Sequence, residues 1–171
     1  MTIRKILYLP DPRLRLVAKP ITEFNDELQG IIDDMFDTMY HAQGVGLAAP
    51  QIGVSLRLFV MDVTGDKTNP LVLINPEVLA SEGQKEYQEG CLSVPGAYET
   101  VVRAQKVTVK ALDRTGKPFE LTGEDLLAEC ILHEIDHLDG KLFVDLLSPL
   151  KRALARKKLD KFKRRQVVSK L

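Results

Sequence analysis

The chain has 171 residues, of which 44% are hydrophobic and 28% charged, the profile of one globular domain with a substantial core. No run approaches 18 consecutive apolar residues and the N-terminus lacks the features of a signal peptide, so we expect a cytoplasmic protein with no membrane partner. In a reducing compartment Cys91 and Cys130 are expected to be free or metal-bound rather than joined in a disulfide.

The net charge of zero conceals an asymmetry along the chain. Residues 151–171 contain ten Lys or Arg and one acid, a net of +9, whereas the preceding 150 residues carry a net of −9. An acidic body with a basic tail differs electrostatically from a neutral protein, and the tail could meet an anionic partner.

Predicted elements begin with "DPRLRLVAKPI" (11–21), where two prolines indicate a turn or a short helical piece. Apolar residues spaced by three and four predict an amphipathic helix from Asn25 to about Ala42. The stretches "LRLFVMDV" (56–63) and "PLVLINPEVL" (70–79) are typical of strands. The alternation in "KVTVKALD" followed by "RTGKPFEL" predicts a hairpin around Thr115–Gly116.

We expect Thr122 to cap the next helix, with Asp125 three residues later in a capping-box arrangement. This helix would run to about Asp139, where Gly140 can take the left-handed conformation that ends helices. Ser148–Pro149 then begins a basic C-terminal helix. Helices and strands do not alternate regularly, so we predict an α+β fold in which mostly antiparallel sheets surround a central helix. Residues 1–147 would form the main body, and residues 148–171 a basic helix appended to the same domain.

The stretch "AECILHEIDHLD" (128–139) contains the pattern H-E-x-x-H. On a helix His133 and His137 lie one above the other on one face, so two imidazoles can converge on one metal ion. Glu134 is turned by about 100° from His133, where a general base for a metal-bound water would sit. The alternative is a buried helix whose histidines form ordinary hydrogen bonds.

A catalytic metal site needs a third ligand. Phe143 stands where metalloproteases of the H-E-x-x-H-x-x-G-x-x-H type have a third histidine, and no glutamate follows Glu134. Asp136 and Asp139 are interpreted as partners of a ligand histidine or as solvated or capping acids, and His41 as an ordinary polar residue.

Cysteine is the remaining ligand type. Cys130 would lie roughly 7 Å along the helix axis from an ion between the two histidines, and a cysteine sulfur reaches only about 5 Å from its Cα. Cys91 is therefore the ligand if there is one, and otherwise a small buried apolar residue. It lies in "QEGCLSVPG" (88–96), interpreted as a loop in which Gly90 permits close backbone approach and Pro95 stiffens the chain.

A second glycine-containing stretch is "GVGLAAPQ" (44–51). It has neither the following Lys-Ser/Thr nor the third glycine of nucleotide-binding loops, so nucleotide binding is not expected. Its small residues instead indicate backbone that passes close to another group, next to Gln51, an uncharged hydrogen-bond donor.

Together, "GVGLAAPQ" (44–51), "EGCLS" (89–93) and "HEIDH" (133–137) resemble the three motifs of the peptide deformylases, in the same order and over nearly the whole chain. The resemblance implies a metallohydrolase that removes the formyl group from the N-terminal formylmethionine of new polypeptides and releases formate. It assigns Cys91, His133 and His137 as metal ligands, with a water in the fourth position. Glu134 would accept the proton of that water and pass it to the leaving amine. The metal, the Leu92 N–H and the Gln51 side chain would hold the oxyanion.

The resemblance also implies how the substrate binds. The peptide would lie extended beside residues 45–47 as an added strand, with its methionine side chain in an apolar pocket. Glu129 at the pocket rim and Tyr98, where several relatives carry arginine, depart from the family pattern, and Glu89 is expected to pair with Arg103 behind Cys91. The substrate contacts carried over are Val45, Gly46, Leu47, Tyr87, Glu89, Gly90, Leu126, Glu129 and Cys130.

The resemblance further implies one divalent metal ion per chain, ferrous iron physiologically and zinc, nickel or cobalt in a purified sample. The partners would be nascent formylmethionyl polypeptides and, through the basic helix, the ribosome near its exit tunnel; we expect a monomer. Two alternatives are a general metallopeptidase and a nucleic-acid-binding protein with a structural zinc, which would need four ligands.

Overall fold

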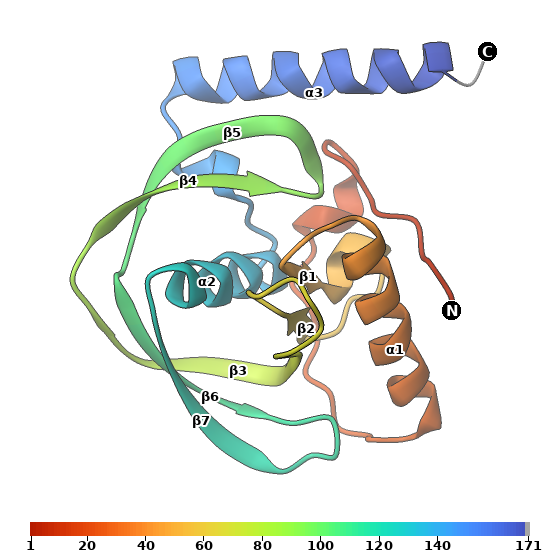
Figure 1. Ribbon diagram of the computed structural model, residues 1–171, viewed down its shortest axis with the longest axis vertical. Coiled ribbons are helices and arrows are strands. Elements are labelled where there is room, and N and C mark those ends of the chain that lie inside the picture. Colours follow the sequence, from red (N-terminus) through yellow and green to blue (C-terminus); the bar gives the residue numbers. More distant parts are fainter. Residues whose placement is uncertain (170–171) are drawn as a thin grey trace.

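A computed structural model describes residues 1–169, with side chains through Gln166, and confirms the α+β class with antiparallel sheets (Figure 1). Within these residues no helix is both long and apolar enough to cross a membrane. The elements in chain order are η1 (Pro12–Arg15), α1 (Asp26–His41), β1 (Gly46–Ala48), η2 (Ala49–Ile52), β2 (Leu58–Met61), β3 (Leu71–Glu82), β4 (Lys85–Cys91), β5 (Val94–Arg103), β6 (Lys106–Leu112), β7 (Pro118–Glu124), α2 (Leu126–Leu138), η3 (Phe143–Leu146) and α3 (Pro149–Ser169).

Two antiparallel sheets enclose the central helix. One has five strands in the order β1-β2-β3-β6-β7, and the other is the pair β4-β5. Figure 1 shows α2 between the β4-β5 pair and strands β3, β6 and β7, while α3 crosses the outer side of β5. A residue of α2 can therefore meet a residue of either sheet.

Helix α1 follows the predicted apolar spacing. Its N-cap Asn25 accepts a hydrogen bond from the Leu28 N–H at 3.0 Å, which satisfies one of the free donors of the first turn. Leu28, Ile32, Met35 and Met39 are buried against the five-stranded sheet. The periodicity was sufficient here because one face of the helix is apolar.

The expected cap of α2 at Thr122 is wrong. Thr122 lies in β7 opposite Thr108, and the two hydroxyl oxygens are 2.9 Å apart. Pairing with β6 satisfies the backbone of this segment, so the chain turns into the helix only at Asp125, whose φ is 54° and whose side chain makes no capping hydrogen bond. The expected end is confirmed, since α2 stops at Leu138 and Gly140 has a φ of 74°.

The segment around Cys91 is not the loop that we expected. Strand β4 ends at Cys91 and β5 begins at Val94, so the chain reverses within two residues. Pro95 stands inside β5, which is possible because each strand of a two-stranded sheet has an edge that needs no donor. The tight reversal holds Cys91 at the end of a paired strand.

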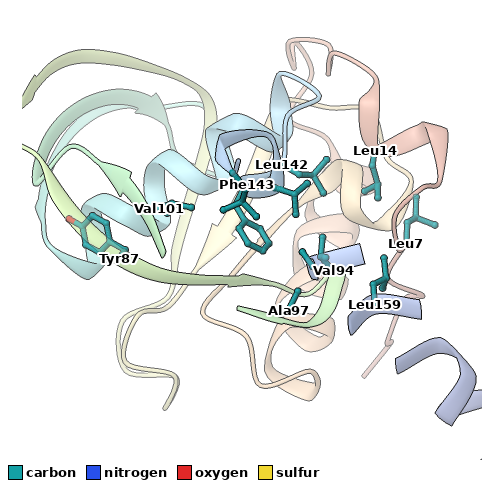
Figure 2. Packing of buried hydrophobic residues seen from close by; sticks show 12 residues of the cluster. Leu7, Leu14, Tyr87, Val94, Ala97, Val101, Leu142, Phe143 and Leu159 are labelled. Carbon is teal, nitrogen blue, oxygen red and sulfur yellow. The ribbon is translucent and has the colours of Figure 1, made fainter. Parts of the chain in front are cut away.

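Helix α3 packs against the outer side of β5. Ala155 and Leu159 are its buried side chains and lie in a cluster with Val94, Ala97 and Phe143 (Figure 2). Helix α3 begins at Pro149 as predicted, and the Ser148 hydroxyl accepts a hydrogen bond from a backbone N–H of its first turn. The helix thus lies on the same sheet that carries Cys91.

Candidate metal centre

Helix α2 places His133, Glu134 and His137 on its buried surface. Their exposed fractions are 8%, 3% and 0%. The Nε2 atoms of the two histidines lie 3.2 Å apart, as expected for imidazoles one turn apart that point at a common position. The Nδ1 atom of His137 has no hydrogen-bond partner within the described part of the chain.

Cys91 completes this group from the opposite sheet. Its Sγ lies 3.3 Å from His137 Nε2, and the three candidate ligand atoms of Cys91, His133 and His137 all lie within 4.8 Å of one another. Metal–sulfur and metal–nitrogen bonds of about 2.3 and 2.0 Å require donors at such separations. One thiolate and two imidazoles therefore fit a divalent transition metal such as iron, zinc, cobalt or nickel.

Cys130 does not join the three ligand atoms, as the reach argument predicted. Its Sγ lies 3.8 Å from the Val45 carbonyl oxygen, and it lines the neighbouring cavity. Burial raises the pKa of the Cys130 thiol, which therefore stays protonated. A protonated thiol is a poor metal ligand.

A buried ion-pair network supports the histidines. Glu89 in β4 hydrogen-bonds the Nδ1 of His133 and receives two hydrogen bonds from Arg103 in β5, at 2.7 and 2.8 Å. The same guanidinium donates to Asp136 in α2 at 2.9 Å. The expected Glu89–Arg103 pair is confirmed, but Asp136 pairs with Arg103 rather than with an imidazole, and Asp139 pairs with Arg57 at 3.0 Å.

The charge of Glu89 depends on these neighbours. Burial acts to raise its pKa, but hydrogen bonds from Arg103 and His133 outweigh burial and lower the pKa to about 2. A carboxylate behind an imidazole sets the tautomer of the ring and makes its other nitrogen a better ligand. Glu89 thereby leaves His133 Nε2 free to face Cys91 and His137.

Glu134 is placed differently from the other buried acids. Its Oε1 has no hydrogen-bond partner within residues 1–169, and burial raises its pKa to about 7. Gly46 in β1 lies against it: a Cβ on Gly46 would crowd the Glu134 carboxylate and lie 2.9 Å from Cys130 Sγ. The glycine is therefore what allows β1 to approach α2 closely, beside an acid able to exchange a proton near neutral pH.

Gln51 presents an oriented amide to the same place. Its Oε1 accepts a hydrogen bond from the Ala48 N–H at 2.9 Å, which fixes the amide so that Nε2 points to Ser93 Oγ at 3.1 Å and Cys91 Sγ at 3.6 Å. Leu92 follows Cys91 directly, and its side chain fills the space that the missing Cβ of Gly44 leaves. Gln51 and Leu92 therefore both line the cavity next to Cys91.

A cavity of about 560 Å³ opens beside these residues. Its boundary includes the expected contacts Val45, Gly46, Glu89, Gly90, Leu126, Glu129 and Cys130. The side chain of Leu47 is in the core, so Leu47 could meet a peptide only through its backbone. Tyr87 packs in the cluster that contains Val94, Ala97 and Phe143, and its hydroxyl donates to the Ala104 carbonyl at 3.3 Å. His41 is exposed and lies outside the group of ligand atoms.

Two properties of the cavity matter for a peptide ligand. Strand β1 is at the edge of its sheet, so the edge that faces the cavity at Val45 and Gly46 has no strand partner among residues 1–169. Glu129 is half-buried in the wall, and burial together with nearby Glu89 raises its pKa to about 7.

Sequence reasoning missed one end of the cavity. Ile6, Tyr8 and Phe162 line it there, although they come from the two ends of the chain. No motif contains them, and only the packing of α3 and the N-terminal segment brings them to the cavity. A lone aromatic residue in a basic helix carries no signal that it faces a ligand site.

The chain matches known proteins along nearly its whole length. The family model described as polypeptide deformylase matches residues 3–153. The peptide deformylases of Azotobacter vinelandii and Pseudomonas aeruginosa are 61% and 59% identical to it, over 94% and 97% of this chain and 96% and 99% of theirs. The crystal structure of a peptide deformylase from Legionella pneumophila is 72% identical with a TM-score of 0.96, covering 97% of this chain and 98% of that one. A peptide deformylase from Synechococcus elongatus in complex with actinonin is 44% identical with a TM-score of 0.87, covering 94% and 88%.

Proposed function

The chain belongs to the polypeptide deformylase family, and from that premise we propose that Cys91, His133 and His137 hold its one divalent metal ion. The family removes the N-terminal formyl group from nascent polypeptides, so this protein is a metal-dependent hydrolase that releases formate from formylmethionine. The convergence of these three donor atoms on one point carries the ligand assignment.

The donor set fits several divalent ions and does not choose among them. From the family resemblance we assign ferrous iron as the physiological ion, and zinc, nickel or cobalt as ions that a purified sample could contain. A bound ion would polarise the formyl oxygen and lower the pKa of a water beside Glu134. A thiolate ligand makes a ferrous site sensitive to oxygen, so iron should be lost or oxidised in air.

The protein groups around this position divide the remaining work. Glu134 accepts the proton of the attacking water and returns it to the leaving amine, a role supported by its burial, its free Oε1 and its raised pKa. The Gln51 amide and the Leu92 N–H stabilise the oxyanion, and such donors are worth roughly 3–4 kcal/mol each. The bond from Ala48 keeps the Gln51 amide in one orientation before substrate arrives.

The edge of β1 binds the substrate backbone. The formylmethionyl peptide adds as a strand along residues 45–47, with Gly90 on the opposite wall, because no strand of the described chain pairs with this edge of the sheet. Its methionine side chain lies in the pocket walled by Leu126, Cys130 and His133, with Glu129 at the rim.

Apart from Phe162, which lines the cavity, α3 presents mostly exposed charged side chains. We assign residues 1–147 to catalysis, and we place the whole protein in the cytoplasm as a monomer. We assign residues 148–171 to docking on ribosomal RNA near the exit tunnel, because α3 exposes many cations. Reversing Lys157, Lys161 and Arg164 to Glu should weaken binding to ribosomes and reduce its dependence on salt, while hydrolysis of a free peptide stays the same. Unchanged ribosome binding would rule out the docking role.

The activity and its residues are tested together. Metal-loaded protein prepared without oxygen should release formate from formyl-Met-Ala-Ser and leave unformylated Met-Ala-Ser intact, whereas a general metallopeptidase would cleave the second peptide. Glu134→Ala should keep the metal content and lose formate release. A structural zinc site would need a fourth ligand, and only three donors come together within residues 1–169.

A further inference from the structure

We propose that the downstream part of the substrate polypeptide leaves the catalytic cavity between α3 and the N-terminal segment and binds a basic groove there. Acidic residues some distance after the formylmethionine would then favour a substrate. The inference rests on the proposed function and adds a second recognition element to it.

Helix α3 forms part of the cavity wall. Phe162 lines the cavity with Tyr8, and the two rings meet edge to face with centroids 5.9 Å apart. Gly96 in β5 faces α3 closely, since a Cβ added to Gly96 would lie 3.7 Å from the Cβ of Phe162. Figure 1 shows the N-terminal segment rising toward the C-terminal half of α3, and Lys163 donates a hydrogen bond to the Leu9 carbonyl oxygen.

A second hollow of about 700 Å³ continues from this end. It shares Ile6, Tyr8 and Ala42 with the catalytic cavity, so the two are adjacent along the same three residues. Its other walls carry Arg4, Lys5, His41 and Lys163, and none of the described residues that line it is acidic. We call this hollow the basic groove.

The boundary at Ile6, Tyr8 and Ala42 connects the catalytic cavity to the groove, so a substrate chain that leaves by this end enters the groove directly. The lining of the catalytic cavity has Glu89, Glu129 and Glu134 and no Lys or Arg within the described chain. The lining of the groove has Arg4, Lys5 and Lys163 and no described acid, so acidic residues of a bound chain would be favoured in the groove.

Lys5 is the cation of the groove that is available to a ligand. Arg4 is paired with Asp34 at 2.9 Å, and Lys163 is held by the Leu9 carbonyl. Lys5 is exposed and makes no ion pair within the described residues. Reversing its charge should therefore disturb the groove without breaking a contact of the fold.

The test uses the full-length, metal-loaded protein and its Lys5→Glu variant. Substrates are formyl-Met-Ala-Ser and formylmethionyl decapeptides in which one Asp or one Lys is moved through positions three to ten. The parent should show a maximum in kcat/KM at a defined Asp position, and Lys5→Glu should lower that maximum by about fivefold, the size expected for one exposed charge pair and its reversal. Both proteins should hydrolyse formyl-Met-Ala-Ser equally. Lys117→Glu, at the exposed turn between β6 and β7, is the matched control and should change nothing.

The outcomes are distinguishable. Equal kcat/KM for every Asp and Lys position would overturn the groove, as would an Asp preference that persists in Lys5→Glu. Weaker RNA binding by Lys5→Glu with unchanged peptide kinetics would assign the groove to nucleic acid and overturn the inference as well. If the parent does not hydrolyse formyl-Met-Ala-Ser, the proposed function fails instead.

Discussion

Helix α2 buries its polar side chains, whereas helix α3 exposes its charged ones. Helix α2 is enclosed by both sheets, and its polar side chains His133, Glu134 and His137 are turned into the interior. Helix α3 lies on the outside of β5 and buries little more than Ala155 and Leu159. A polar residue in the first helix needs a partner or a function, whereas a charged residue in the second needs neither. Substitutions should therefore be costly in and around α2 and mild on α3.

The largest effect is expected where α2 meets Cys91. Cys91→Ser should reduce metal affinity by more than the roughly 10–100-fold that loss of a partner of a ligand costs, because a ligand itself is removed. The metal-to-protein ratio after dialysis would measure this. Cys130→Ala provides the matched control, since Cys130 is a buried thiol outside the three donors, and it should retain the metal. Equal retention by both variants would contradict the ligand set.

Next comes the network behind His133. Arg103→Met should lower the free energy of unfolding by about 3–5 kcal/mol, because the buried Glu89 carboxylate would lose both hydrogen bonds from the guanidinium and keep its contact with His133 alone among the described residues. Denaturant unfolding of the metal-free protein would measure it. Arg103→Lys keeps the charge but loses the planar fork, so its loss should be intermediate. A loss below about 1 kcal/mol in Arg103→Met would show that the pair is not stabilising α2.

Packing of α3 should give a smaller change. Leu159 is 3% exposed, and Leu159→Ala should cost about 2–3 kcal/mol, near the lower end of the range for buried leucines because the helix can settle onto the gap. Leu150→Ala should change the unfolding free energy by less than about 0.5 kcal/mol, since Leu150 is 71% exposed. Equal effects at both positions would mean that α3 does not rest on β5 in solution.

The smallest effect concerns η3, which joins the two helices. Burial acts to raise the pKa of Asp145, but the hydrogen bonds from Arg15 outweigh it and the net shift is downward from 3.8. A lowered pKa means that the stabilisation is complete above the unfolded value and is lost as pH falls through the folded one. The difference in unfolding free energy between parent and Asp145→Asn should thus be constant above about pH 5, small, and fading below pH 4. A difference that instead grows on acidification would contradict the sign.

Local sequence signals predicted the helices but not all of the strands. Helices α1, α2 and α3 were recognised because periodicity, H-E-x-x-H and Ser148–Pro149 are local signals. Strand β4 was missed because its inward positions Tyr87, Glu89 and Cys91 mix an aromatic ring, a carboxylate and a thiol. Its partner β5 was missed as well, since its buried positions Val94, Ala97, Val101 and Arg103 are unevenly spaced and include a charged residue. A strand with a buried carboxylate does not show the apolar alternation by which strands are recognised. The polar residues of the site thus removed the sequence pattern by which β4 could have been predicted.

Within the site, excluding Cys130, Phe143 and any later glutamate left Cys91 as the candidate third ligand, and the family resemblance then implied the set Cys91, His133 and His137. The Glu89–Arg103 pair came from the family resemblance. The role of Asp136 was misjudged because a helical pattern does not reveal which cation lies across from it. Tyr8 and Phe162 could not be found at all, since 154 positions separate them and nothing local links them to the cavity.

Arg103 sets how the site can and cannot move. One planar guanidinium is held between Glu89 of the cysteine-bearing hairpin and Asp136 of the histidine-bearing helix. Because this group links the two walls, separating them near Cys91 and His133 would expose a buried charge pair. Widening for a bulky nascent chain is therefore expected at the far rim, where Tyr8 packs against Phe162 and Lys163 donates to the Leu9 carbonyl oxygen. The rim of the cavity would then widen while the distance between Cys91 and the two histidines stays the same.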